Sequence, residues 1–194
     1  MVMINRILFP LLIGLLLLPI GCKRQSAPQT GTTKSSSETR YPNLKTQADE
    51  LNQVTLKGDD ARAADLTYPK LIEVMGGREQ YIDNLKTVRD EMQSEKFSVL
   101  SATVGDPTDI VEVENQIYAI VPVTMRMKVP EGILVGRSSM IGVSNDGGKN
   151  WTFVTANRDQ LKGETLKILF PAAADKLRIP EPTEPVLERQ TPTP

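Results

Sequence analysis

The sequence predicts an α+β domain in which N-terminal helices pack on one face of an antiparallel sheet of four to five strands. Between residues 44 and 92 apolar residues recur every three to four positions, which is the period of an amphipathic helix. At Phe97 the period changes to two, and turn sequences rich in Gly, Asn, Asp and Pro then separate the apolar runs. Helices followed by strands favour an α+β domain over the alternating order of a parallel sheet.

Three helices are predicted in the first half of the chain. The first ends at Gly58, a residue suited to the left-handed conformation after a helix. The second begins at Asp59 or Asp60 and ends at the glycine pair 76–77, and Pro69 kinks it or starts a new turn. The third begins near Arg78. Its apolar stripe consists of Tyr81, Leu85, Val88 and Met92.

Strands are predicted over residues 97–102, 110–114, 117–129, 133–143 and 150–155, and a short helix over 159–169. In the longest strand, alternate apolar residues form a stripe from Ile117 to Met127 that we expect to face the helices. Tyr118 and Arg126 fall on the opposite side of this strand, toward solvent or the rear of the sheet.

The chain is predicted to consist of four parts. Residues 1–21 read as an export signal, because the apolar run of residues 7–20 is shorter than the ~20 residues needed to span a bilayer. Residues 22–40 form a polar tether, and residues 41–178 form the folded domain. Residues 179–194 are rich in proline and are expected to be a disordered tail.

The end of the export signal resembles the lipobox of bacterial lipoproteins. The residues that carry this resemblance are Leu18-Pro19-Ile20-Gly21-Cys22, although relatives usually carry Leu where this chain has Pro19. The resemblance implies cleavage between Gly21 and Cys22 and attachment of membrane lipid to the Cys22 thiol. It also favours the outer membrane, where one exists, because Lys23 stands where an inner-membrane retention signal has Asp. The sequence therefore predicts an exported, lipid-anchored protein of the cell envelope.

Composition excludes several functional classes. The chain has no His and one Cys, so it has no His general base, no Ser-His-Asp triad and no cysteine-rich metal site. A net charge of −1 gives no electrostatic reason to bind nucleic acid. We expect no metal and no cofactor.

A turn near the end of the sheet resembles the Asp-box of sialidase-like propellers. The matching residues are Ser144, Asp146, Gly148 and Trp151. The motif occurs once, in a chain too short for a propeller, so we interpret it as a structural turn. We expect the Asp146 carboxylate to accept backbone N–H groups of the turn, Gly148 to adopt a positive φ, and Trp151 to be buried.

The stretch from about Leu44 to Ala156 resembles the nuclear-transport-factor-2-like (cystatin-like) superfamily. The resemblance lies in the order of the elements, the glycine pair Gly76-Gly77, the long third helix and the strand that ends DGGKNWTF. It implies a strongly bent sheet that encloses a conical cavity with the helices. The residues expected to line this cavity are Tyr68, Tyr81 and Met125.

Three functions remain open. The favoured one is a non-catalytic ligand-binding or accessory domain for a small apolar ligand. The second is an assembly lipoprotein that acts as a sheet-mediated homodimer or partner scaffold, with Ile120 and Leu134 on its contact surface. The third is an isomerase- or cyclase-like enzyme, as the resemblance allows, and we assign it no catalytic residue. Its candidate groups are Asp60, Tyr68, Tyr81, Asp90, Tyr118 and Arg126.

Overall fold

The computed structural model describes residues 40–188 apart from 157–160, 162 and 182. The predicted export signal, Cys22, nearly all of the tether and the last six residues of the tail lie outside this described part. Within it, no helix is both long enough and apolar enough to cross a membrane.

Four helices precede the sheet, and local sequence sets their ends. They are α2 (Pro42–Lys57), α3 (Asp60–Leu66), α4 (Pro69–Val74) and α5 (Arg78–Ser94). Gly58 ends α2 in the left-handed conformation, and the Asp59 side chain caps α3 by accepting from the Arg62 N–H. The predicted second helix is therefore two helices, because the Pro69 ring cannot continue α3 and instead begins α4.

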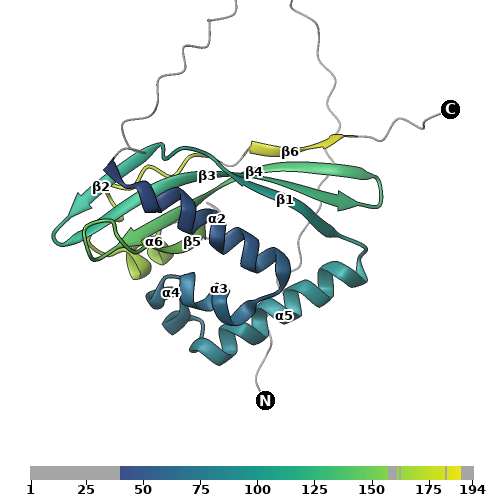
Figure 1. Ribbon diagram of the computed structural model, residues 1–194, viewed down its shortest axis with the longest axis horizontal. Coiled ribbons are helices and arrows are strands. Elements are labelled where there is room, and N and C mark those ends of the chain that lie inside the picture. Colours follow the sequence, from purple (N-terminus) through teal and green to yellow (C-terminus); the bar gives the residue numbers. More distant parts are fainter. Residues whose placement is uncertain (1–39, 157–160, 162, 182, 189–194) are drawn as a thin grey trace, which may run out of the picture. The chain divides into compact units, whose positions relative to one another are not determined.

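A single antiparallel sheet of six strands forms the rest of the fold. Its strands are β1 (Ser98–Val104), β2 (Asp109–Val113), β3 (Gln116–Val129), β4 (Gly132–Ser144), β5 (Thr152–Ala156) and β6 (Thr183–Glu188). The long strands β3 and β4 pair along their whole length, β1 and β2 both pair with β3, and β5 and β6 both pair with β4. Helices α2 to α5 lie together on one side of the curved sheet (Figure 1), so the predicted fold class is confirmed.

Strand β6 corrects the prediction for the C-terminal region. Part of the stretch expected to be a disordered tail adds a sixth strand to the sheet, one more than the upper number predicted. Pro185 lacks an N–H, but it lies where the register with β4 shifts, between Val135 and Arg137. Proline is tolerated at such an irregularity on an edge strand. The short helix predicted over 159–169 is present as α6 over Glu164–Leu169, and residues 159, 160 and 162 of the predicted range lie outside the described part.

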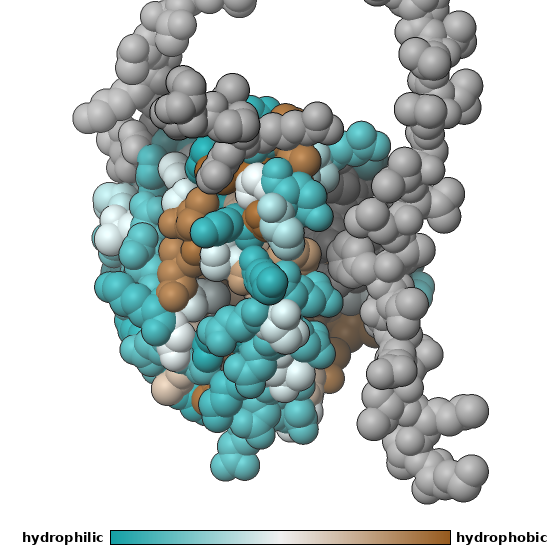
Figure 2. Space-filling model, turned by 90° about the vertical axis from the view of Figure 1, so that its right-hand side faces the viewer, coloured by the Kyte–Doolittle hydropathy of each residue, from teal (hydrophilic) through white to brown (hydrophobic). Residues whose placement is uncertain are grey.

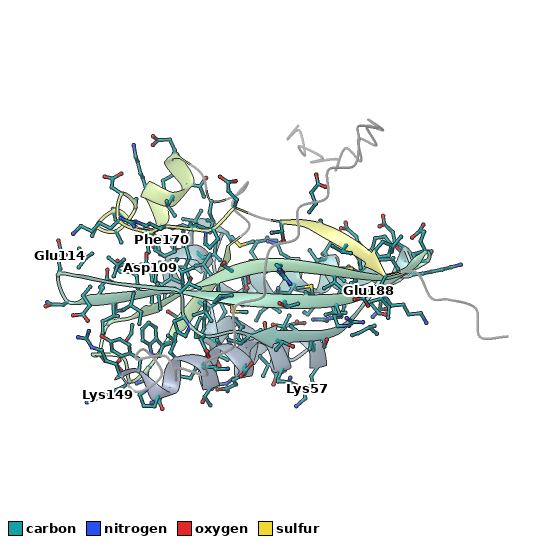
Figure 3. All side chains as sticks on the ribbon, turned by 90° about the horizontal axis from the view of Figure 1, so that it is seen from above. Lys57, Asp109, Glu114, Lys149, Phe170 and Glu188 are labelled. Atoms are coloured by element: carbon teal, nitrogen blue, oxygen red, sulfur yellow. The ribbon has the colours of Figure 1, made fainter. Side chains whose placement is uncertain are left out.

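Both faces of the sheet carry a buried core. The first core lies between the helices and the face of β3 that carries Ile117, Val121 and Val123, so the apolar stripe faces the helices as predicted. The second core lies on the opposite face, where α6 and the segment after it cover β3 and β4. Phe170 lies on one side of the strands and Lys57 of α2 on the other (Figure 3).

The second core overturns the prediction that Ile120 is exposed. Tyr118 lies on the rear of the sheet, one of the two positions predicted for it, and is 1% exposed, whereas Ile120, expected on a contact surface, is fully buried. Both are covered because Leu161, Leu169 and Phe170 fold back over this face. Ile120 is therefore unavailable to a partner. Leu134 remains half-buried on the β4 half that the second core does not cover.

Candidate functional site

A cavity of about 200 Å³ lies between the helices and the face of the sheet that they cover. For scale, an engineered cavity of about 150 Å³ in another protein binds benzene. The walls of the cavity in the present protein come from α2, α4, α5 and strands β3, β4 and β5. Most of the lining side chains are apolar: Leu51, Leu71, Leu85, Val123, Met125, Met140 and Phe153. We call this space the inner cavity.

One polar group in the inner cavity lacks a partner. Asn52 is 8% exposed, and its side-chain Nδ2 makes no hydrogen bond. No other buried side-chain nitrogen or oxygen of the described residues is left without a partner. An unsatisfied buried donor costs about 1–3 kcal/mol, so the fold retains Asn52 here at the expense of stability. A ligand oxygen that accepted from Nδ2 would remove this cost.

A second polar pair closes one wall of the inner cavity. The Thr67 hydroxyl donates to the carbonyl of Ala63 at 2.8 Å, and Thr67 Oγ1 lies 3.0 Å from the Tyr81 hydroxyl. Because the single proton of Thr67 is used by Ala63, Tyr81 donates in this second bond. The Tyr81 oxygen is thereby held at the cavity wall with its lone pairs available to accept.

Two of the three residues predicted to line the cavity do so. Tyr81 and Met125 are lining residues, but Tyr68 is not. Tyr68 instead stacks on Phe170 in the second core, with ring centroids 5.4 Å apart, and burial raises the pKa of its hydroxyl. The physical reason is the break at Pro69, where the backbone leaves the helical path and the Tyr68 N–H donates to the carbonyl of Phe153 at 2.9 Å.

Asn52 was not among the residues predicted to line the cavity, although the sequence holds a signal for it. Asn52 lies one turn after Ala48 and next to Leu51, within the apolar stripe of α2. A polar residue in a stripe that faces a core requires either a partner or a function. The position of Asn52 within this apolar stripe was the signal from which a role in the cavity could have been predicted.

The candidate catalytic groups are not brought together. Asp60 is buried, but it forms an ion pair with Arg89, and Asp90 is exposed on α5. Tyr118 donates to the Gln116 side chain on the opposite face of the sheet, where Arg126 also pairs with Glu188 of β6. None of the described residues that line the inner cavity carries a carboxylate. The acid and base groups of an isomerase-like reaction are therefore not assembled in this space.

The Asp-box-like turn joins β4 to β5 through hydrogen bonds centred on Asp146. Its Oδ1 accepts from the backbone N–H groups of Lys149 and Asn150, both at 3.0 Å, and its Oδ2 accepts from Asn150 Nδ2 at 2.7 Å. The Ser144 Oγ accepts from the Gly148 N–H at 2.9 Å. The bonds to Asn150 lead the causes that lower the pKa of Asp146 to about 2, with the Ser144 hydroxyl contributing less.

The same turn positions helix α2. Trp151 is 2% exposed, its indole N–H donates to the Gly148 carbonyl at 3.0 Å, and its backbone N–H donates to Gln47 Oε1 at 2.7 Å. Gln47 belongs to α2, the helix that carries Asn52. The turn therefore fixes the helix at one end of the cavity and does not itself line the cavity.

Replacing Asp146 with Ala is expected to lower the urea midpoint at pH 7, because two backbone N–H groups of the turn lose their acceptor. The pKa of Asp146 is lowered in the folded protein from 3.8 to about 2, so its contribution is present above about pH 4 and is lost as the pH falls toward 2. Urea denaturation of both proteins at pH 7, 4, 3 and 2 measures this difference. Asp83→Ala, which removes an exposed ion pair of α5, is the control and should shift the midpoint little. A difference between wild type and Asp146→Ala that stays constant down to pH 2 would contradict this assignment.

Comparison with known proteins adds no further information about the site. No family model, curated protein or solved structure matches this chain. The resemblance to the nuclear-transport-factor-2-like superfamily and the resemblance to the lipobox both stay predictions. The residues of the cavity are therefore what indicates a function.

Proposed function

We propose that this chain is a membrane-anchored, non-catalytic binding protein whose inner cavity takes a small apolar ligand with one hydrogen-bond acceptor. The unpartnered amide of Asn52 supports this proposal most directly. An apolar cavity with one or two fixed polar groups is the usual composition of a small-molecule site. The apolar walls supply affinity, and the Asn52 Nδ2 supplies orientation by donating to the ligand's acceptor.

Replacing Asn52 with Leu tests this assignment because stability and binding should change in opposite directions. The folded protein should gain about 1–3 kcal/mol of unfolding free energy, since the buried unpaired amide is removed. Binding of cyclohexanone, a ring of suitable size with one carbonyl, should weaken by about threefold to tenfold, which is the worth of one hydrogen bond. Urea denaturation and isothermal titration calorimetry measure the two effects.

Two controls separate the amide from the cavity walls. Methylenecyclohexane, which lacks the acceptor, should bind wild type and Asn52→Leu equally. Gln53→Leu, a change on the exposed side of the same helix, should leave cyclohexanone binding unchanged. If Asn52→Leu lowers stability, or if cyclohexanone does not distinguish it from wild type, the Asn52 amide is not part of a ligand site.

The proposal includes a lipid anchor at Cys22, supported by the sequence between Leu18 and Cys22. Such an anchor would hold the cavity next to a membrane, where apolar molecules are concentrated. Cys22→Ser should move the protein from the membrane fraction to the soluble fraction and abolish incorporation of labelled palmitate. Persistence of the variant in membranes after an alkaline wash would contradict lipid anchoring, and it would leave the cavity assignment untouched.

A further inference from the structure

A second hollow lies next to the inner cavity, along helix α5. It has a volume of about 270 Å³ and lies between the end of α2, the second half of α5 and the start of β1. Thr55 and Leu85 line both spaces, so the two adjoin at these side chains. We call this second space the outer groove. Its apolar walls are Leu56, Leu85, Val88, Met92, Phe97 and Val99.

Helix α5 covers these spaces without burying its own apolar side chains. No residue of α5 is buried, and Val88 is 54% exposed. Polar contacts attach the helix to α3 and to Thr67, the residue that follows α3. They join Arg78 to Asp65 and to the Ala61 carbonyl, Tyr81 to Thr67, and Arg89 to Asp60. Apolar surface also remains uncovered among polar atoms at the end of the molecule seen in Figure 2, which is the end that carries β1 and the second half of α5 in Figure 1.

The charge of the two spaces narrows the class of ligand. Arg89 is the only charged side chain among the described residues that line either space, and its guanidinium is paired with the buried Asp60 carboxylate. A ligand carboxylate would therefore find no net positive charge. Placing an unpaired charge in such a site is costly, so a neutral ligand is favoured.

We infer that the inner cavity and the outer groove form one binding site for an elongated neutral amphiphile. Its oxygen acceptor binds the Asn52 amide, and its hydrocarbon chain passes Leu85 into the outer groove. This inference rests on the proposed function and adds the class of ligand. Because benzene fits a cavity of about 150 Å³, the inner cavity takes roughly eight non-hydrogen atoms and the outer groove roughly ten more.

Titration with unbranched methyl ketones of increasing length, from 2-pentanone to 2-pentadecanone, tests the inference. Each added methylene should strengthen binding about fourfold while it enters an apolar space. In wild type the increase should continue beyond roughly eight non-hydrogen atoms, which is the size of the inner cavity. The fatty acid of the same length, titrated at pH 8, should bind at least tenfold more weakly than the ketone.

A pair of matched variants locates the chain in the groove. Val88→Glu places a carboxylate at the groove and should stop the increase at the length that fills the inner cavity. Val74→Glu changes a valine of α4 that is equally exposed, 53% against 54%, but lines neither space, so it should behave as wild type.

The outcomes separate this inference from the proposed function. If wild-type affinity stops rising near eight non-hydrogen atoms, the groove does not take the chain, and the inner cavity remains a site. If Val88→Glu and Val74→Glu give the same length dependence, the chain lies elsewhere and the inference is wrong. If no ketone of any length binds, both the inference and the proposed function are wrong.

Discussion

Replacing Phe170 with Ala is expected to lower the free energy of unfolding by about 3–5 kcal/mol, the range for removing a buried aromatic ring. Phe170 is fully buried in the second core. Its ring stacks on Tyr68 and meets the Tyr118 ring edge-on at 6.0 Å. Loss of the ring would leave both tyrosines beside a void. It would also loosen the packing of the C-terminal segment on the face of β3 and β4 that is opposite the helices.

Urea denaturation followed by the fluorescence of Trp151, the only tryptophan of the chain, measures this loss. Ile168→Ala is the matched control, because Ile168 lies two residues earlier and is 52% exposed. Its cost should stay within about 0.5 kcal/mol, as for other surface substitutions. A cost for Phe170→Ala as small as that of Ile168→Ala would contradict the packing of this segment against the sheet.

Replacing Gly148 with Ala is expected to cost about 2–5 kcal/mol, for two reasons that add together. Gly148 has φ +88, a backbone conformation that residues other than glycine rarely adopt. In addition, a Cβ at this position would lie 2.3 Å from Cδ1 of Tyr41, whose ring packs edge-on against Trp151. The backbone of the turn can lie this close to Tyr41 only because Gly148 has no side chain.

The neighbouring glycine separates the two causes. Gly147 has φ +76 but no atom within 4 Å of an added Cβ, so Gly147→Ala should show only the conformational cost, about 1–2 kcal/mol. Thermal or urea denaturation of both variants measures the difference. The additional cost at Gly148 should largely disappear when Tyr41→Ala is the starting protein, because the clash is then removed. Equal costs at the two glycines in the wild-type background would show that Tyr41 does not pack on the turn.

Periodicity was enough to predict the first and third helices, α2 and α5, and the face of the sheet that the helices cover. The stripe from Ile117 to Met127 and the glycine at the end of α2 are local signals, and both have the predicted structure. The second core was not predicted, because helices were expected on one face of the sheet only, which left Ile120 of the opposite face exposed. Tyr118 and Ile120 were the signal for this second core, because with them the sequence from Ile117 to Val121 is an unbroken apolar run. Such a run is typical of a strand covered on both faces, and all five residues are buried.

The parts that the sequence left unpredicted depend on long-range contacts. All side chains of β6 are exposed, so main-chain pairing with β4 and the ion pair between Arg126 and Glu188 hold the strand, and neither leaves a pattern of apolar residues. Helical spacing placed Tyr81, and strand alternation placed Met125, on the side that faces the cavity, and both line it. The error at Tyr68 came from treating α3 and α4 as one helix, which assigned this side chain to the wrong face.

The end-to-end arrangement of the short strands divides the sheet into two regions of unequal local stability. At one end β2 and β5 flank the long hairpin, and β3 and β4 are buried on both faces. At the other end β1 and β6 flank it, and most side chains there are only half-buried. Because only β3 and β4 run through both regions, the β1 end can open locally while the region around Phe170 stays folded. A ligand of the proposed site would then enter and leave through transient openings of a part of the protein whose loss does not unfold the rest.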